Sequence, residues 1–136
     1  MSKRGLNILL GAASLTLGGL LYILFRENSY IASFVNGFTL VSKIRQIFRF
    51  CACDFLKYYF PDFLWGFSLC CGLMAIYVPA KRGMVICGLA AFLFGCLWEL
   101  AQYLGIVSGT GDALDMIMYL TAGLAGIFIN LKERVK

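Results

Sequence analysis

Four apolar runs, each close to the length of a membrane crossing, constrain this chain more than any other feature. Residues 5–25 carry no charge, and ~21 residues of α-helix extend ~31 Å, enough to cross a hydrocarbon core of ~30 Å. Further runs follow at residues 63–79, 84–104 and 113–131, each ending at a polar, proline or glycine-rich stop. The pattern predicts an all-α integral membrane protein with a bundle of four transmembrane helices.

The composition supports one membrane domain over residues 1–136. Hydrophobic residues make up 61% of the chain and charged residues 14%, which is too little polar surface to cover a water-soluble core. The net charge of +5 comes from short Lys and Arg clusters beside the apolar runs. This distribution favours lipid headgroups over nucleic acid as the partner of the positive charge.

The basic residues at the ends of the runs predict the orientation of the bundle. With four spans, seven basic residues fall on the side of the termini: Lys3, Arg4, Lys81, Arg82, Lys132, Arg134 and Lys136. Five fall on the other side, in the loop between the first two runs: Arg26, Lys43, Arg45, Arg49 and Lys57. Because positive charge directly at the span ends favours the cytoplasmic side, we expect both termini to be cytoplasmic.

The loop between the first two spans has a helical pattern of its own. Over residues 31–58, apolar side chains recur at helical spacing and basic or polar ones fall largely on the opposite side. This pattern predicts an amphipathic helix at the outer membrane surface. A helix packed as a lid over the mouth of the bundle would show the same periodicity.

The acidic residues of the spans gather at the predicted outer end. Asp62 opens the second span, Glu99 lies inside the third, and Asp112 and Asp115 begin the fourth. A carboxylate within a span costs ~2.5–3.5 kcal/mol and normally faces the bundle interior or a cavity. Gln102 shares a helix face with Glu99, and Tyr119 shares one with Asp115. We therefore predict an outer ligand-binding pocket built from Asp62, Glu99, Gln102, Asp112, Asp115 and Tyr119.

Other interpretations of these residues remain open. The aspartates could cap helix N-termini, with Glu99 held by Gln102 and Tyr119 as interhelical contacts. A functional site could bind a cationic or polyol headgroup, hold a hard metal ion, or relay a proton. Residues 109–112 also resemble the G-x-G-D motif of intramembrane aspartyl proteases, for which only Asp62 could be the second aspartate.

Several residue types argue against other chemistry. The chain has no histidine, which excludes Ser-His and Cys-His catalysis and His-ligated zinc. The six cysteines are interpreted as packing residues rather than a disulfide frame: Cys51, Cys53, Cys70, Cys71, Cys87 and Cys96. We also expect Trp65, Trp98 and Tyr103 to be interface anchors or packing residues. No catalytic residue and no cofactor is expected.

Residues 60–130 resemble the VanZ-like family of small bacterial membrane proteins. The resemblance rests on Glu99-x-x-Gln102, on Gly109-Thr110-Gly111-Asp112-x-x-Asp115 with small residues after it, and on Pro61-Asp62 before the second span. The chain departs from some members by having Tyr119 where they have Asn, and by lacking their Arg in the preceding loop. Contacts made by those residues are not carried over.

The resemblance implies a bacterial cell-membrane protein connected with the envelope and with glycopeptide antibiotic resistance. Its expected ligand is an envelope lipid or a glycopeptide-like molecule. A proton- or cation-coupled transporter or accessory subunit is the alternative, and an intramembrane hydrolase is a lesser one. Glycine-lined helix faces further suggest a homo-oligomer or a membrane-protein partner.

Overall fold

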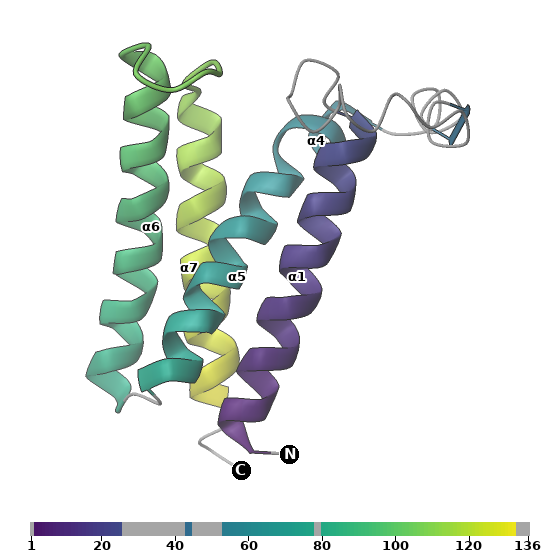
Figure 1. Ribbon diagram of the computed structural model, residues 1–136. Helices are drawn as coiled ribbons and strands as arrows, with labels where there is room; N and C mark the ends of the chain where they lie inside the picture. Colours follow the sequence, from purple (N-terminus) through teal and green to yellow (C-terminus); the bar gives the residue numbers. More distant parts are fainter. Residues whose placement is uncertain (1, 26–42, 45–52, 78–79, 133–136) are drawn as a thin grey trace.

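The computed structural model describes residues 2–25, 43–44, 53–77 and 80–132. Its helices are α1 (Lys3–Phe25), α4 (Asp54–Tyr58), α5 (Phe60–Tyr77), α6 (Lys81–Tyr103) and α7 (Ala113–Lys132). The four long helices are apolar and long enough to cross a membrane. They confirm the all-α class and match the four predicted apolar runs (Figure 1).

The helix starts differ from the predicted spans by a few residues. α5 begins at Phe60 rather than at residue 63, and α6 begins at Lys81 rather than at residue 84. The predicted spans were bounded by polar residues, whereas the backbone is already helical through them. Pro61 fits because the first turn of a helix needs no backbone N–H donor at that position.

Most of the predicted amphipathic segment, residues 31–58, lies outside the described residues. Within the described part, α4 is a short helix that leads directly into α5. Its Asp54 forms an ion pair of 3.8 Å with Lys57 one turn later. The prediction of an interfacial helix stays untested.

The long helices lie side by side in the order α1, α5, α7, α6 (Figure 1). The start of α1 and the end of α7 lie at one end of the bundle. The starts of α5 and α7 and the end of α6 lie at the opposite end, which we call the acidic end because Asp62, Glu99, Asp112 and Asp115 belong to it. The four acidic residues of the predicted site therefore lie at the same end of the bundle, as predicted.

Small residues allow α1 to approach α5 closely. Gly11, Ser14 and Gly18 are the buried small residues of α1, and the Ser68 hydroxyl on α5 donates a hydrogen bond of 2.8 Å to the carbonyl of Gly11. A Cβ at Gly18 would lie 2.6 Å from the Trp65 ring. Close approach of this kind is what drives helix association in lipid.

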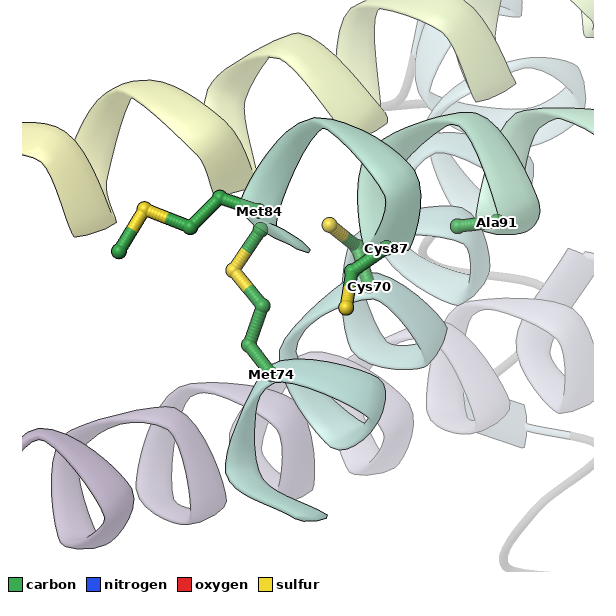
Figure 2. Close-up of a cluster of buried hydrophobic side chains, with 5 residues drawn as sticks. All are labelled: Cys70, Met74, Met84, Cys87 and Ala91. Carbon is green, nitrogen blue, oxygen red and sulfur yellow. The ribbon is translucent and has the colours of Figure 1, made fainter. Parts of the chain in front are cut away.

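The core of the bundle is rich in sulfur. Cys70 and Met74 of α5 pack against Met84, Cys87 and Ala91 of α6 (Figure 2). The described cysteines are free thiols, and Cys70, Cys71 and Cys87 are buried. The predicted packing role is confirmed for these three, since a buried thiol behaves as a small apolar group. Cys53 is exposed, and Cys51 lies outside the described residues.

Two asparagines join α1 to α7 near the end opposite the acidic one. Asn7 Nδ2 donates to Asn130 Oδ1 over 2.8 Å, and Asn130 Nδ2 donates to Asn7 Oδ1 over 3.0 Å. Both residues are buried. The reciprocal pair satisfies polar groups that would be costly to leave unpaired in lipid, and so fixes the register between the first and last spans.

Candidate functional site

The six predicted site residues lie at the acidic end, on three helices and one connecting loop. α5 supplies Asp62 in its first turn, and α6 supplies Glu99 and Gln102 near its end. Asp112 precedes α7, and Asp115 and Tyr119 lie in the first two turns of that helix. Of these, Glu99, Asp115 and Tyr119 are buried.

Tyr119 occupies the centre of the group. Its hydroxyl donates a hydrogen bond of 2.9 Å to Asp62 Oδ1, which joins α7 to α5. Its ring lies between two glycines: a Cβ at Gly66 would lie 2.8 Å from the ring, and a Cβ at Gly95 would overlap it. Two positions without side chains, one on α5 and one on α6, thus make the space for the aromatic ring.

Two further acidic side chains are buried at the same end of the bundle as the Tyr119–Asp62 contact. Glu99 is 2% exposed and Asp115 is 6% exposed. The Glu99 side chain accepts a hydrogen bond of 3.1 Å at Oε2 from the backbone N–H of Asp112. This bond anchors the start of α7 to α6, a contact that the helical spacing did not predict.

Asp112 combines the capping role with a contact across the site. Its Oδ1 accepts a hydrogen bond of 3.0 Å from the backbone N–H of Leu114 at the start of α7, as an N-cap residue does. It also accepts a hydrogen bond from the phenol of Tyr59, the residue between α4 and α5. Partial burial, together with the Asp112 and Asp115 carboxylates, raises the pKa of Tyr59 above its ordinary value.

Asp62 and Asp115 do not act as N-caps. Both lie inside the first turn of their helices rather than before it. The Asp62 carboxylate faces Tyr119 on another helix, and Asp115 is buried. The capping interpretation therefore holds for Asp112 alone among the three aspartates.

Gln102 follows Glu99 by three residues on α6 and lies against the loop after that helix. A Cβ at Gly109, which has a positive φ of 144°, would lie 2.6 Å from the Gln102 amide. The loop after α6 thus folds back onto this side chain and needs glycine to do so. Gln102 lines a pocket of about 190 Å³ with Tyr22, Pro61, Asp62, Trp65, Trp98, Val107 and Ser108.

A second, apolar cavity of about 240 Å³ adjoins this polar pocket. Its lining residues come from all four long helices: Leu15, Trp65, Gly66, Leu69, Ala91, Phe94, Gly95, Trp98 and Tyr119. Trp65 and Trp98 belong to both cavities. The two tryptophans were predicted to be anchors or packing residues, and the sequence contained no signal that they line a cavity.

The positions of the acidic residues bear on two alternative chemistries, metal binding and aspartyl-protease hydrolysis. Within residues 2–25, 43–44, 53–77 and 80–132, no group of three or more Cys, Asp or Glu side chains is arranged to hold a metal ion. Asp62 and Asp112 hydrogen-bond to different tyrosines, Tyr119 and Tyr59. An aspartyl protease instead needs two aspartates that share one proton.

Sequence reasoning missed four residues at this end. Tyr59 contacts Asp112, and Tyr22 packs its ring against Trp65 at a centroid distance of 5.5 Å. Val107 and Ser108 belong to the loop and close the polar pocket. Their positions depend on how the helices meet, for which the sequence carries no local pattern.

Comparisons with protein-family models, with curated proteins and with solved structures found no match. The resemblance of residues 60–130 to the VanZ-like family therefore stays a prediction based on the motifs alone.

Proposed function

We propose that the protein is a multi-pass protein of a bacterial cell membrane whose acidic end faces outward and binds a polar or cationic ligand of the cell envelope. The observation that carries this proposal is the burial of Glu99 and Asp115 at the end of the bundle where Asp62 accepts a hydrogen bond from Tyr119. Carboxylates are costly in a membrane protein interior, and they are retained there mainly where they serve a function.

Access to the site supports binding from the polar pocket. Asp62 and Gln102 line that pocket, so a ligand in it could meet one carboxylate and one amide. Glu99 and Asp115 are buried behind them and add negative potential to the site. A ligand with an amine or several hydroxyl groups matches these partners.

The expected outward orientation and the VanZ-like resemblance agree with this proposal. Both would give the acidic end access to envelope lipids or glycopeptide-like molecules. A connection with glycopeptide resistance belongs to the same proposal and depends on the resemblance.

A thermal-shift experiment on the detergent-purified protein tests the binding. Spermidine, ethanolamine, choline and divalent cations are added to the wild type and to Asp62→Asn, Glu99→Gln and Asp115→Asn. Asp54→Asn is the matched control, because the Asp54 side chain is 84% exposed and pairs with Lys57. We expect an amine to raise the Tm of wild type and of the control, and to raise that of Asp62→Asn much less.

Two results would contradict the proposal. One is that none of these compounds shifts the Tm of the wild type. The other is that the shift is unchanged in all three site variants, which would mean that the carboxylates serve only to hold the helices together.

The burial of Glu99 and Asp115 favours one second candidate, a proton- or cation-coupled transporter or accessory subunit. Proteoliposomes loaded with a pH-sensitive dye distinguish it from binding. Proton or cation flux that disappears in Glu99→Gln, in protein whose Tm is unchanged, would favour transport.

A further inference from the structure

We propose that the ligand of the acidic end is a cationic amphiphile, with its amine headgroup in the polar pocket and its hydrocarbon chain in the adjoining apolar cavity. This inference rests on the proposed function and specifies the class of ligand. It is carried by the juxtaposition of two cavities of opposite polarity that share the side chains of Trp65 and Trp98.

The residues that line the two cavities lie at different depths along the helices. Along α5, Asp62 lines the polar pocket and Leu69 lines the apolar cavity, which at the helical rise corresponds to ~10 Å. Along α6, Gln102 lines the polar pocket and Ala91 lines the apolar cavity. The helical rise places these two residues ~16 Å apart. These depths are close to one leaflet of a hydrocarbon core ~30 Å thick.

The packing of the helices explains why the apolar cavity exists. α1 packs along α5, and α6 packs chiefly along α7; the two pairs diverge toward the acidic end (Figure 1). Gly66, Ala91 and Gly95 line the cavity between the pairs with almost no side-chain volume. Leu15, Leu69 and Phe94 complete an apolar wall suited to a hydrocarbon chain.

The polar pocket carries the features that select the headgroup. Asp62 is the charged side chain among its described lining residues, and its carboxylate complements an amine. Tyr22, Trp65 and Trp98 contribute aromatic rings, whose faces attract a cation. Gln102 and Ser108 supply neutral hydrogen-bonding groups.

Fluorescence quenching tests both halves of the proposal directly. Trp65 and Trp98 are the two tryptophans of the chain, so intrinsic emission reports on the cavities themselves. The full chain is reconstituted in nanodiscs of zwitterionic lipid and titrated with a single-chain alkyl amine brominated along its chain. Bromine quenches tryptophan only at short range. We expect saturable quenching that an unbrominated alkyl amine reverses.

Matched probes and variants separate this site from bulk lipid. An alkyl sulfate with the same brominated chain should bind at least tenfold more weakly than the amine. Asp62→Asn should weaken binding of the amine about tenfold. The double variant Leu15→Phe, Leu69→Phe narrows the apolar cavity and should also weaken binding of the amine. Leu9→Phe, Leu93→Phe is the control, since both leucines are similarly exposed but line neither cavity.

The outcomes distinguish this inference from the proposed function. Short amines could stabilise the protein through Asp62 while the brominated amine quenches without saturation. That result would contradict the proposal of an amphiphilic ligand and would support the proposed binding site for amines. If the sulfate and the amine bind equally, headgroup selection is wrong. If neither short nor long amines bind, both proposals fail.

Discussion

Tyr119 shows how much of the site depends on single residues. Its hydroxyl reaches Asp62 on α5, and its ring fills the space left by Gly66 and Gly95. One side chain therefore connects three helices. The polar contact and the packing contact can be separated, because phenylalanine keeps the ring and loses only the hydroxyl.

Tyr119→Phe should lower the free energy of unfolding by about 1 kcal/mol, the usual net contribution of one hydrogen bond. It should also weaken amine binding, because the Asp62 carboxylate loses the donor that orients it. Unfolding in mixed micelles with increasing denaturing detergent measures the first effect. Tyr103→Phe is the control, since Tyr103 is 78% exposed; equal effects of the two variants would contradict the role given to Tyr119.

At the scale of the helices, glycine positions determine which pairs approach closely. Gly123 on α7 faces the backbone of α6, where a Cβ would lie 2.9 Å from the carbonyl oxygen of Gly88. A Cβ at Gly126 would lie 2.6 Å from Cys70 Sγ on α5. Both glycines therefore lie in close contact with a neighbouring helix. Without a hydrophobic driving force between helices in lipid, such backbone proximity is a main source of their affinity.

Gly95→Ala and Gly19→Ala form a matched pair for this effect. The new methyl at Gly95 would overlap the Tyr119 ring, whereas the methyl at Gly19 would meet nothing within 4 Å. Overpacking typically costs about 1–3 kcal/mol, and we expect that loss for Gly95→Ala. Gly19→Ala should leave the stability unchanged or raise it by up to about 1 kcal/mol through helix propensity.

The same denaturation assay measures both glycine variants. If Gly95→Ala were as stable as Gly19→Ala, the ring of Tyr119 would have room to move and would not define the contact between α6 and α7.

At the scale of the whole molecule, charge is distributed unequally between the two ends. The described basic residues at the span ends opposite the acidic end are Lys3, Arg4, Lys81, Arg82 and Lys132. The candidate site contributes four carboxylates at the acidic end. Under the positive-inside rule this asymmetry predicts cytoplasmic termini and an outward site, as the proposed function requires.

Reporter fusions in a bacterial host test this orientation. Green fluorescent protein fused after residue 136 should fluoresce, because it folds in the cytoplasm. Alkaline phosphatase inserted after residue 108, in the loop between α6 and α7, should be active, because it needs export to form its disulfides. The reverse pair of results would place the acidic end in the cytoplasm and contradict the envelope ligand.

Much of the fold could be predicted from the sequence because the bilayer limits the choices. Backbone groups must be satisfied within each span, so long apolar runs become helices with few alternatives. The four long apolar helices and the shared end of the acidic residues were accordingly predicted close to their observed places. The helix starts at Phe60 and Lys81 differed because polar residues can belong to the first turn of a helix.

The site was predicted only in outline. Helical periodicity placed Glu99, Gln102, Asp115 and Tyr119 on faces of their own helices, but it holds no information on which face meets which neighbour. Two contacts join partners that the spacing did not predict: Tyr119 binds Asp62, and Glu99 binds the backbone of Asp112. The Asn7–Asn130 pair could have been suspected, because both are polar residues within apolar spans.

The sequence by itself determined the number of spans and the end of the bundle that carries the carboxylates, because both follow from hydrophobic length and from position along a helix. Only the tertiary structure decided that Trp65 and Trp98 lie between a polar and an apolar cavity, and that Gly66 and Gly95 admit the ring of Tyr119. These features depend on how helices distant in the chain cross. The side chains of one helix form a cavity or a close contact only together with those of the helix that packs against it.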